Sequence, residues 1–120
     1  MIEPKYNIMM LVQPQLGVND PELSPRIDRV IDAVINVRSL DKNKFFSKIR
    51  NREYVYARRT VAYILRDELN LTLYQIKKAL RRDHSTIHAG LKWFYEHKDV
   101  FHRDYPEIYE MMYAGRRALC

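Results

Sequence analysis

The sequence is poor in residues that build covalently stapled or metal-stapled folds. Its 120 residues include one cysteine, Cys120, which excludes an internal disulfide and a cysteine-rich zinc site. A lone thiol agrees with a reducing compartment, so the expected location is cytoplasmic. No apolar run approaches the roughly 18 residues of a membrane span, and the N-terminal segment lacks the features of a signal peptide. We therefore expect no membrane association.

Glycine is also scarce, with three in the chain, and no GxxxxGK[ST] phosphate-binding loop occurs. The acidic residues are scattered, whereas a metal-dependent nuclease needs them clustered. His84 and His88 have the i, i+4 spacing of a helical metal pair, but the glutamate of HExxH and a third ligand are missing. We therefore expect a protein that is not an enzyme and needs no metal or other cofactor.

Positive charge is present in excess and is concentrated in the middle of the chain. The net charge is +6. Residues 38–66 hold nine basic and two acidic side chains, a net +7, and residues 77–92 hold five and one, a net +4. Two neighbouring basic segments favour a polyanionic partner, although a solvated basic surface is the alternative.

The apolar spacing predicts one small all-α domain. Ser24-Pro25 has the form of a cap and first residue of a helix over 25–37, and Asp41 is a candidate cap for a short helix. A long helix begins near Tyr54 and stops at Asn70, with an apolar face made by Val55, Val61, Ile64, Leu65 and Leu69. Helices over 73–80, 84–98 and from Pro106 onward follow.

The predicted architecture is a helical bundle that contains a helix-turn-helix, with an extended N-terminal arm and an extra C-terminal helix. Thr72 is the expected cap of the first helix of the motif, and Arg81-Arg82-Asp83 form the turn. We divide the chain into an arm (1–23), a DNA-binding domain (24–98) and a helical extension (99–120).

The second helix of this motif opens with an unusual run of polar side chains, RDHST at residues 82–86. On a helical wheel, Ser85, His88, Ala89, Lys92 and Glu96 fall opposite Ile87, Gly90 and Phe94. In a helix-turn-helix, N-terminal residues of the second helix meet base edges in the major groove, where donors and acceptors are needed. Helix capping alone would explain Asp83 or Ser85, but it would not explain the whole run.

Arg82-Asp83-His84-Ser85-Thr86, followed by an apolar residue and then Lys92, resembles the signature of the C-terminal DNA-binding domain (domain IV) of the bacterial replication initiator DnaA. The resemblance continues upstream through Thr72-Leu73, Glu68-Leu69, Arg59 and Ser47-Lys48, and covers about residues 25–98. It implies a DnaA-like, Trp-repressor-like helix-turn-helix that binds short asymmetric origin boxes in double-stranded DNA.

The resemblance also implies contacts, residue by residue. Base contacts fall on Arg82, Asp83, His84, Ser85 and Thr86. The arginine that enters the minor groove is Arg50 or Arg52, in the basic run KIRNRE at residues 48–53, which is predicted to form a loop. Arg59 and Leu73 match backbone-contacting positions of the family. With the neighbouring basic and capping residues added, the expected phosphate-contacting set is Lys48, Arg58, Arg59, Thr72, Leu73, Lys77 and Lys92.

Some positions depart from the family pattern. The family usually has two glycines before the signature arginine, whereas Leu80-Arg81-Arg82 contains none, and the turn is one residue shorter than usual. Tyr74 replaces a common proline, Trp93 stands at a usually basic position, and His88 stands at an apolar one. The 120 residues leave no room for the initiator's ATPase, and a chain of this size would suit a phage or mobile element.

The sequence thus predicts a DNA-binding accessory or regulatory factor in replication initiation or transcription, favoured to bind as a monomer, with its oligomeric state open. The alternative is an adaptor or inhibitor that binds a replication protein through the aromatic segment at residues 101–119. Its Tyr105, Tyr109, Met111, Met112 and Tyr113 would then form a docking surface, unless they cover the bundle's own core. RNA binding is a weaker option, because no exposed-aromatic sheet motif is present.

Overall fold

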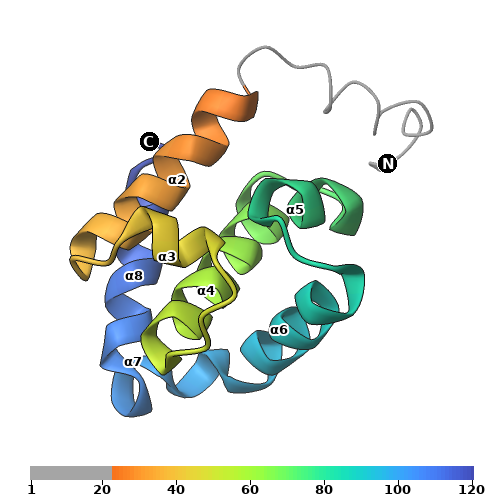
Figure 1. Cartoon of the computed structure of the whole chain (residues 1–120). Coiled ribbons are helices and arrows are strands. Elements are labelled where there is room, and N and C mark those ends of the chain that lie inside the picture. Colours follow the sequence, from red (N-terminus) through yellow and green to blue (C-terminus); the bar gives the residue numbers. More distant parts are fainter. Residues whose placement is uncertain (1–22) are drawn as a thin grey trace, which may run out of the picture.

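Helix α4 (Arg52–Glu68) is the central element of the computed structural model, which describes residues 23–120 (Figure 1). Helices α2, α3, α5, α6 and α8 pack against it. Its buried side chains are Tyr54, Ala57, Thr60, Val61, Ala62, Tyr63, Ile64 and Leu65. Val55, which the sequence pattern assigns to the apolar face, is partly exposed and lies outside the core, because Tyr54 and Ala57 occupy that face. No strand occurs in the described residues, and the predicted all-α fold is confirmed.

Helix α2 (Leu23–Val37) packs across α4 and α8. The prediction that Ser24 caps this helix is wrong, because Leu23 is already helical and Ser24 lies in the first turn. Pro25 is tolerated there, since the first amides of a helix have no partner within it. The buried face is made by Val30, Ile31, Val34 and Ile35.

Helix α8 (Pro106–Arg117) closes the bundle against α2 and α4 and begins with a proline in its first turn, as predicted. Ile108 and Met111 are buried in the common core. Gly115 marks a close approach of α8 to α4 and α2, because a Cβ atom there would lie 2.5 Å from Cδ1 of Ile64 and 3.1 Å from Cγ2 of Val34. A side chain at this position would push α8 away from its neighbours.

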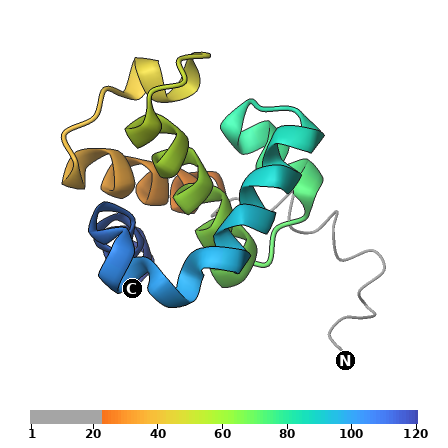
Figure 2. The same ribbon diagram turned by 90° about the horizontal axis from the view of Figure 1, so that it is seen from below.

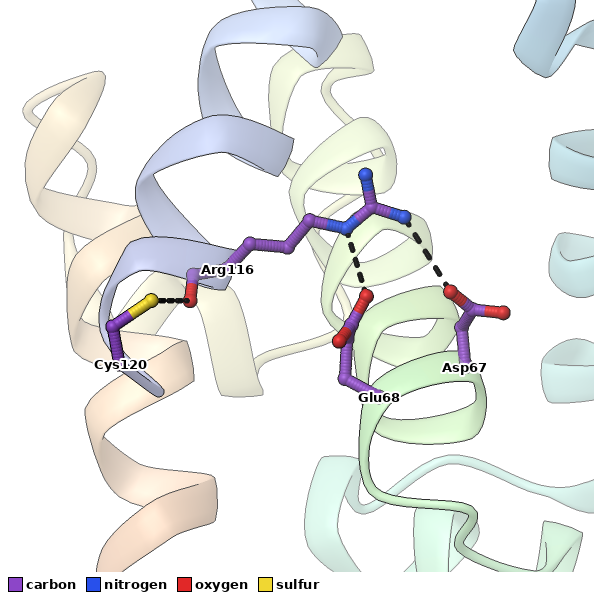
Figure 3. A network of polar contacts seen from close by, with 4 residues as sticks. All are labelled: Asp67, Glu68, Arg116 and Cys120. Atoms are coloured by element: carbon purple, nitrogen blue, oxygen red, sulfur yellow. Dashed lines mark hydrogen bonds and ion pairs between the residues drawn. The ribbon is translucent and has the colours of Figure 1, made fainter.

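Arg116 joins α8 to the C-terminal end of α4 (Figure 3). Its guanidinium forms ion pairs with Glu68 at 3.1 Å and with Asp67 at 3.4 Å. It also lies 5.8 Å from the ring centre of Tyr63. A cation that meets two carboxylates and an aromatic ring fixes the orientation of α8 more firmly than one exposed ion pair would.

Three further helices begin and end close to the predicted residues: α3 (Lys42–Phe46), α5 (Leu73–Leu80) and α6 (His84–His97). The 3-10 helix η1 (Lys98–Val100) and helix α7 (Phe101–Asp104) follow α6. Asp41 caps α3 and Thr72 caps α5, as predicted. Asn70 has a φ of 55°, the left-handed conformation that ends α4. The sequence pattern did not predict η1 and α7, which carry the buried Phe101.

Two further expectations concern the N-terminal arm and membrane-spanning helices. The predicted N-terminal arm lies outside the described residues, apart from Leu23. Between residues 23 and 120, no helix has both the length and the apolar character needed to cross a bilayer.

Candidate nucleic-acid interface

Helices α5 and α6 form the predicted helix-turn-helix, and their turn contains no glycine. Arg81 adopts the left-handed conformation with a φ of 57° and caps α5. The amides of Arg81 and Arg82 both donate to the carbonyl of Lys77. The Arg81 guanidinium lies 4.3 Å from the ring centre of Phe46, a contact that compensates for the backbone strain of a non-glycine residue there.

The N-terminus of α6 presents exposed polar side chains around a capping aspartate. Oδ1 of Asp83 accepts hydrogen bonds from the Thr86 amide at 2.8 Å and the Ser85 hydroxyl at 3.2 Å. These bonds, those of Thr86 first, hold the pKa of the Asp83 carboxyl below its usual range. Asp83 is therefore an ionised acceptor at neutral pH, with Oδ2 as its second acceptor atom.

The outer face of α6 follows the predicted wheel. Ile87, Gly90, Leu91 and Phe94 are buried against the bundle. The exposed residues of this helix up to Glu96 are His84, Ser85, Thr86, His88, Ala89, Lys92, Tyr95 and Glu96. Lys92 and Glu96 form an ion pair at 3.9 Å, the long end of such contacts. The first turn and a half of α6 is thus lined by small and hydrogen-bonding side chains.

The basic loop lies between α3 and α4, and Figure 2 shows it along the same edge of the molecule as the α5–α6 turn. Lys48 and Arg50 in this loop and Arg52 at the start of α4 are exposed, whereas Ile49 is half-buried and packs against the core. The Ser47 hydroxyl accepts a hydrogen bond from the Ile49 amide at 3.2 Å and donates one to the Lys44 carbonyl at 2.7 Å. The loop therefore has an apolar anchor and outward-facing cations.

Arg58 and Arg82 do not project outward, although the sequence assigns both to DNA. Arg58 donates to the carbonyls of Lys44, Phe45, Ser47 and Ile49. Arg82 donates to the carbonyls of Phe45 and Ser47. Burial, then repulsion from Arg82, lowers the pKa of Arg58 to about 10, and burial also lowers the pKa of Arg82. Both remain charged at neutral pH.

Arg59 lies between α4 and the second helix of the motif. Its guanidinium sits 4.8 Å from the ring centre of Trp93, and its side chain fits against Gly90, where a Cβ atom would lie 3.1 Å from Cγ of Arg59. Trp93 stacks on Tyr56 at 5.5 Å and on His97 at 4.5 Å. Partial burial lowers the pKa of Arg59. Trp93, which inherited no role from the family pattern, therefore orients this arginine. Its i, i+4 spacing to His97 is the sequence feature that could have indicated the stacked aromatic cluster.

The N-terminus of α5 adds a second group of polar atoms. The Thr72 hydroxyl accepts a hydrogen bond from the backbone amide of Gln75 at 3.1 Å. The side-chain oxygen of Gln75 accepts one from the backbone amide of Thr72 at 2.8 Å. Leu73 is half-buried in the first helical position, and Lys77 is half-exposed one turn later. The exposed ring of Tyr74 lies within 6 Å of the amines of Lys77 and Lys78, at 5.9 and 5.5 Å.

His84 and His88 both lie on the exposed face of α6. The rings of His84 and His88 are 6.5 Å apart, and no cluster of three metal-ligand side chains occurs among residues 23–120.

Met111, in the C-terminal aromatic segment, is buried, which supports the interpretation that part of this segment covers the core. Tyr109 and Tyr113 remain exposed and line a shallow open hollow with Arg38, Pro106, Glu107 and Glu110.

An exposed polar helix N-terminus beside a basic loop, on a helix-turn-helix, defines a DNA-binding helix-turn-helix protein. Comparison with known proteins agrees: the family model for the bacterial dnaA protein helix-turn-helix matches residues 27–93, and the chain belongs to this family. The predicted resemblance is thereby confirmed.

Two curated relatives share this segment. A chromosomal replication initiator protein DnaA from Oleidesulfovibrio alaskensis is 32% identical over 65 residues, which are 54% of this chain and 14% of the relative. A protein of the same name from Ureaplasma parvum serovar 3 is 39% identical over 61 residues, 50% of this chain and 13% of the relative. The chain thus matches about one seventh of these relatives' length. No solved structure matches it.

Proposed function

We propose that this protein reads a specific sequence in double-stranded DNA and acts as an accessory or regulatory factor in replication initiation or transcription. Helix α6 would enter the major groove by its N-terminus, and the basic loop would enter the adjacent minor groove. The observation that carries the proposal is the exposed run His84-Ser85-Thr86 on one edge of the molecule with the exposed cations of the loop. A narrow minor groove attracts arginine because it concentrates negative potential.

The proposed contacts divide into three groups. Asp83, His84, Ser85 and Thr86 would meet base edges: the ionised Asp83 accepts from a cytosine amino group, and the Thr86 methyl suits a thymine methyl. Arg50 or Arg52 would occupy the minor groove. Phosphates would be bound by Lys48, Arg59, Lys77, Lys92 and the capped start of α5 at Thr72 and Leu73. Arg58 and Arg82 are left out of this set, because their donors already bind carbonyls of the loop.

The direct test is fluorescence anisotropy with a duplex that carries an initiator box and a scrambled duplex of equal length, at two salt concentrations. We expect a preference of at least about a hundredfold that persists at the higher salt, because base contacts depend less on counterion release than phosphate contacts do. Equal binding of both duplexes, lost together in salt, would exclude this box, and site selection from random duplexes would then decide whether any sequence is preferred.

Arg59→Ala is expected to weaken the box duplex and the scrambled duplex by about the same factor and to reduce the salt slope by about one, because a phosphate contact carries no sequence information. Arg66→Ala is the matched control. Arg66 lies on the same helix, but bonds the Leu71 carbonyl at 2.8 Å instead of facing α6. A loss confined to the box duplex would argue against a phosphate contact by Arg59.

A second candidate function is an adaptor that binds a replication protein through α8. The observation that favours it is the exposure of Tyr109 and Tyr113, at 56% and 62% of their surface, beside the Arg38–Glu110 ion pair. Aromatic side chains are enriched at protein interfaces. The double substitution Tyr109→Ser and Tyr113→Ser separates the two functions, since it should leave DNA binding unchanged and abolish any partner binding through this hollow.

A further inference from the structure

Two arginines from different elements converge on the C-terminal end of the short helix α3. Arg58, from α4, reaches the carbonyls of Phe45 at 2.7 Å, Ile49 at 2.8 Å, Lys44 at 3.0 Å and Ser47 at 3.1 Å. Arg82, from the α5–α6 turn, reaches the Phe45 carbonyl at 3.2 Å and also bonds the Ser47 carbonyl. The basic loop and the helix-turn-helix are therefore joined through shared acceptors.

The chemistry of these acceptors explains why arginine is used. The last carbonyls of a helix have no partner within it, and they form its negative end. Arg58 directs its donors at four different carbonyls, a pattern that a single ammonium group cannot reproduce. Arg82 adds a second planar donor group to two of the same carbonyls.

Within residues 23–120, neither arginine is placed to neutralise a carboxylate, which indicates that their role is to hold the backbone of the loop. Among the ion pairs of the described residues, neither Arg58 nor Arg82 has a carboxylate partner. Two cations that share acceptors repel one another, and both are partly desolvated. The carbonyl bonds must offset these terms, so the loop is held in one conformation for as long as they persist.

We propose that Arg58 and Arg82 are positioning residues that lock the basic loop, residues 47–51, onto the α5–α6 turn. The lock fixes the spacing between Arg50 and the N-terminus of α6, so that both can contact adjacent grooves without reordering the loop first. Its consequence for DNA rests on the function proposed above, whereas the lock itself is a property of the free protein.

The lock is tested without DNA by limited trypsin digestion, because Lys48 and Arg50 are cleavage sites inside the loop. Arg58→Lys keeps the charge but loses most of the carbonyl bonds, and we expect cleavage after Lys48 or Arg50 to accelerate at least about fivefold. Arg66→Lys, which removes an arginine–carbonyl bond elsewhere on α4, should cleave in the loop like the unmodified protein. Mass spectrometry of the products separates local opening from unfolding, which would also accelerate cleavage after Arg66 or Lys78.

The consequence for DNA is tested by a double-mutant cycle on the box duplex. Arg50→Ala should weaken binding by about tenfold in the unmodified protein, but by less than about threefold in the Arg58→Lys background, because a released loop no longer presents Arg50 at a fixed position. If Arg52 is the arginine in the groove, the same cycle with Arg52→Ala shows the coupling.

The outcomes are distinguishable. Unchanged loop cleavage in Arg58→Lys would overturn the lock, whatever the protein does with DNA. Absence of coupling in the cycle, with unchanged affinity in Arg58→Lys and a salt slope reduced by about one in Arg58→Gln, would identify Arg58 as a phosphate contact instead. If the unmodified protein binds no duplex, the proposed function fails, and the digestion result alone decides on the lock.

Discussion

Phe94→Ala is expected to lower the free energy of unfolding by about 3–5 kcal/mol, the largest single effect that we anticipate. Phe94 is fully buried on the inner face of α6. Its ring lies 4.7 Å from that of Tyr63 on α4 and 4.5 Å from that of Phe101 on α7. The substitution would therefore leave a cavity where three helices meet, and the surrounding rings are too constrained to fill it.

Chemical denaturation followed by circular dichroism measures this effect, with Tyr95→Ala as the control. Tyr95 is the next residue along α6 and is 45% exposed, so its loss should cost less than about 1 kcal/mol. A Phe94→Ala protein that loses no more than the control would contradict the packing described for this site.

Thr86→Ala and His84→Ala are expected to relax discrimination between the preferred base pair and its alternatives by about 1–3 kcal/mol at one or two positions. The reason is that both side chains are exposed at the start of α6, where a helix-turn-helix meets base edges. Competition anisotropy against duplexes with single base-pair changes gives the effect at each position.

Lys92→Ala is the control for these two substitutions, because Lys92 is exposed on the same helix about two turns from its start. It should weaken all duplexes by a similar factor, as expected for a phosphate contact. If Thr86→Ala and His84→Ala also reduce binding to preferred and random duplexes equally, the assignment of α6 as the recognition helix fails.

Features that depend on local sequence could be predicted well from the chain. Asp41, Thr72 and Asp83 each precede a helix, and each caps it in the structure, because a cap is formed with amides two or three residues away. Asn70 ends α4 for a similarly local reason. The outward face of α6 followed from its helical period, which is also local.

Features that depend on tertiary placement could not be predicted in this way. Arg58 and Arg82 lie far apart in the sequence, and nothing in their neighbourhoods indicates that both turn toward the carbonyls at the end of α3. Likewise, Met111 is buried while Tyr109 and Tyr113, on the same helix, are exposed, a division set by where α2 and α4 cross α8. A resemblance transfers residue types at matching positions, but not the direction in which a side chain points.

The position of α8 has a practical consequence for measurement. Cys120 follows this helix, is exposed, and is the one thiol among the 120 residues. Figures 1 and 2 both place the C-terminus away from the α5–α6 turn. A maleimide dye would therefore react at a single, defined site remote from the groove-facing edge, and single-molecule energy transfer to a labelled duplex could give the polarity with which the protein sits on an asymmetric site.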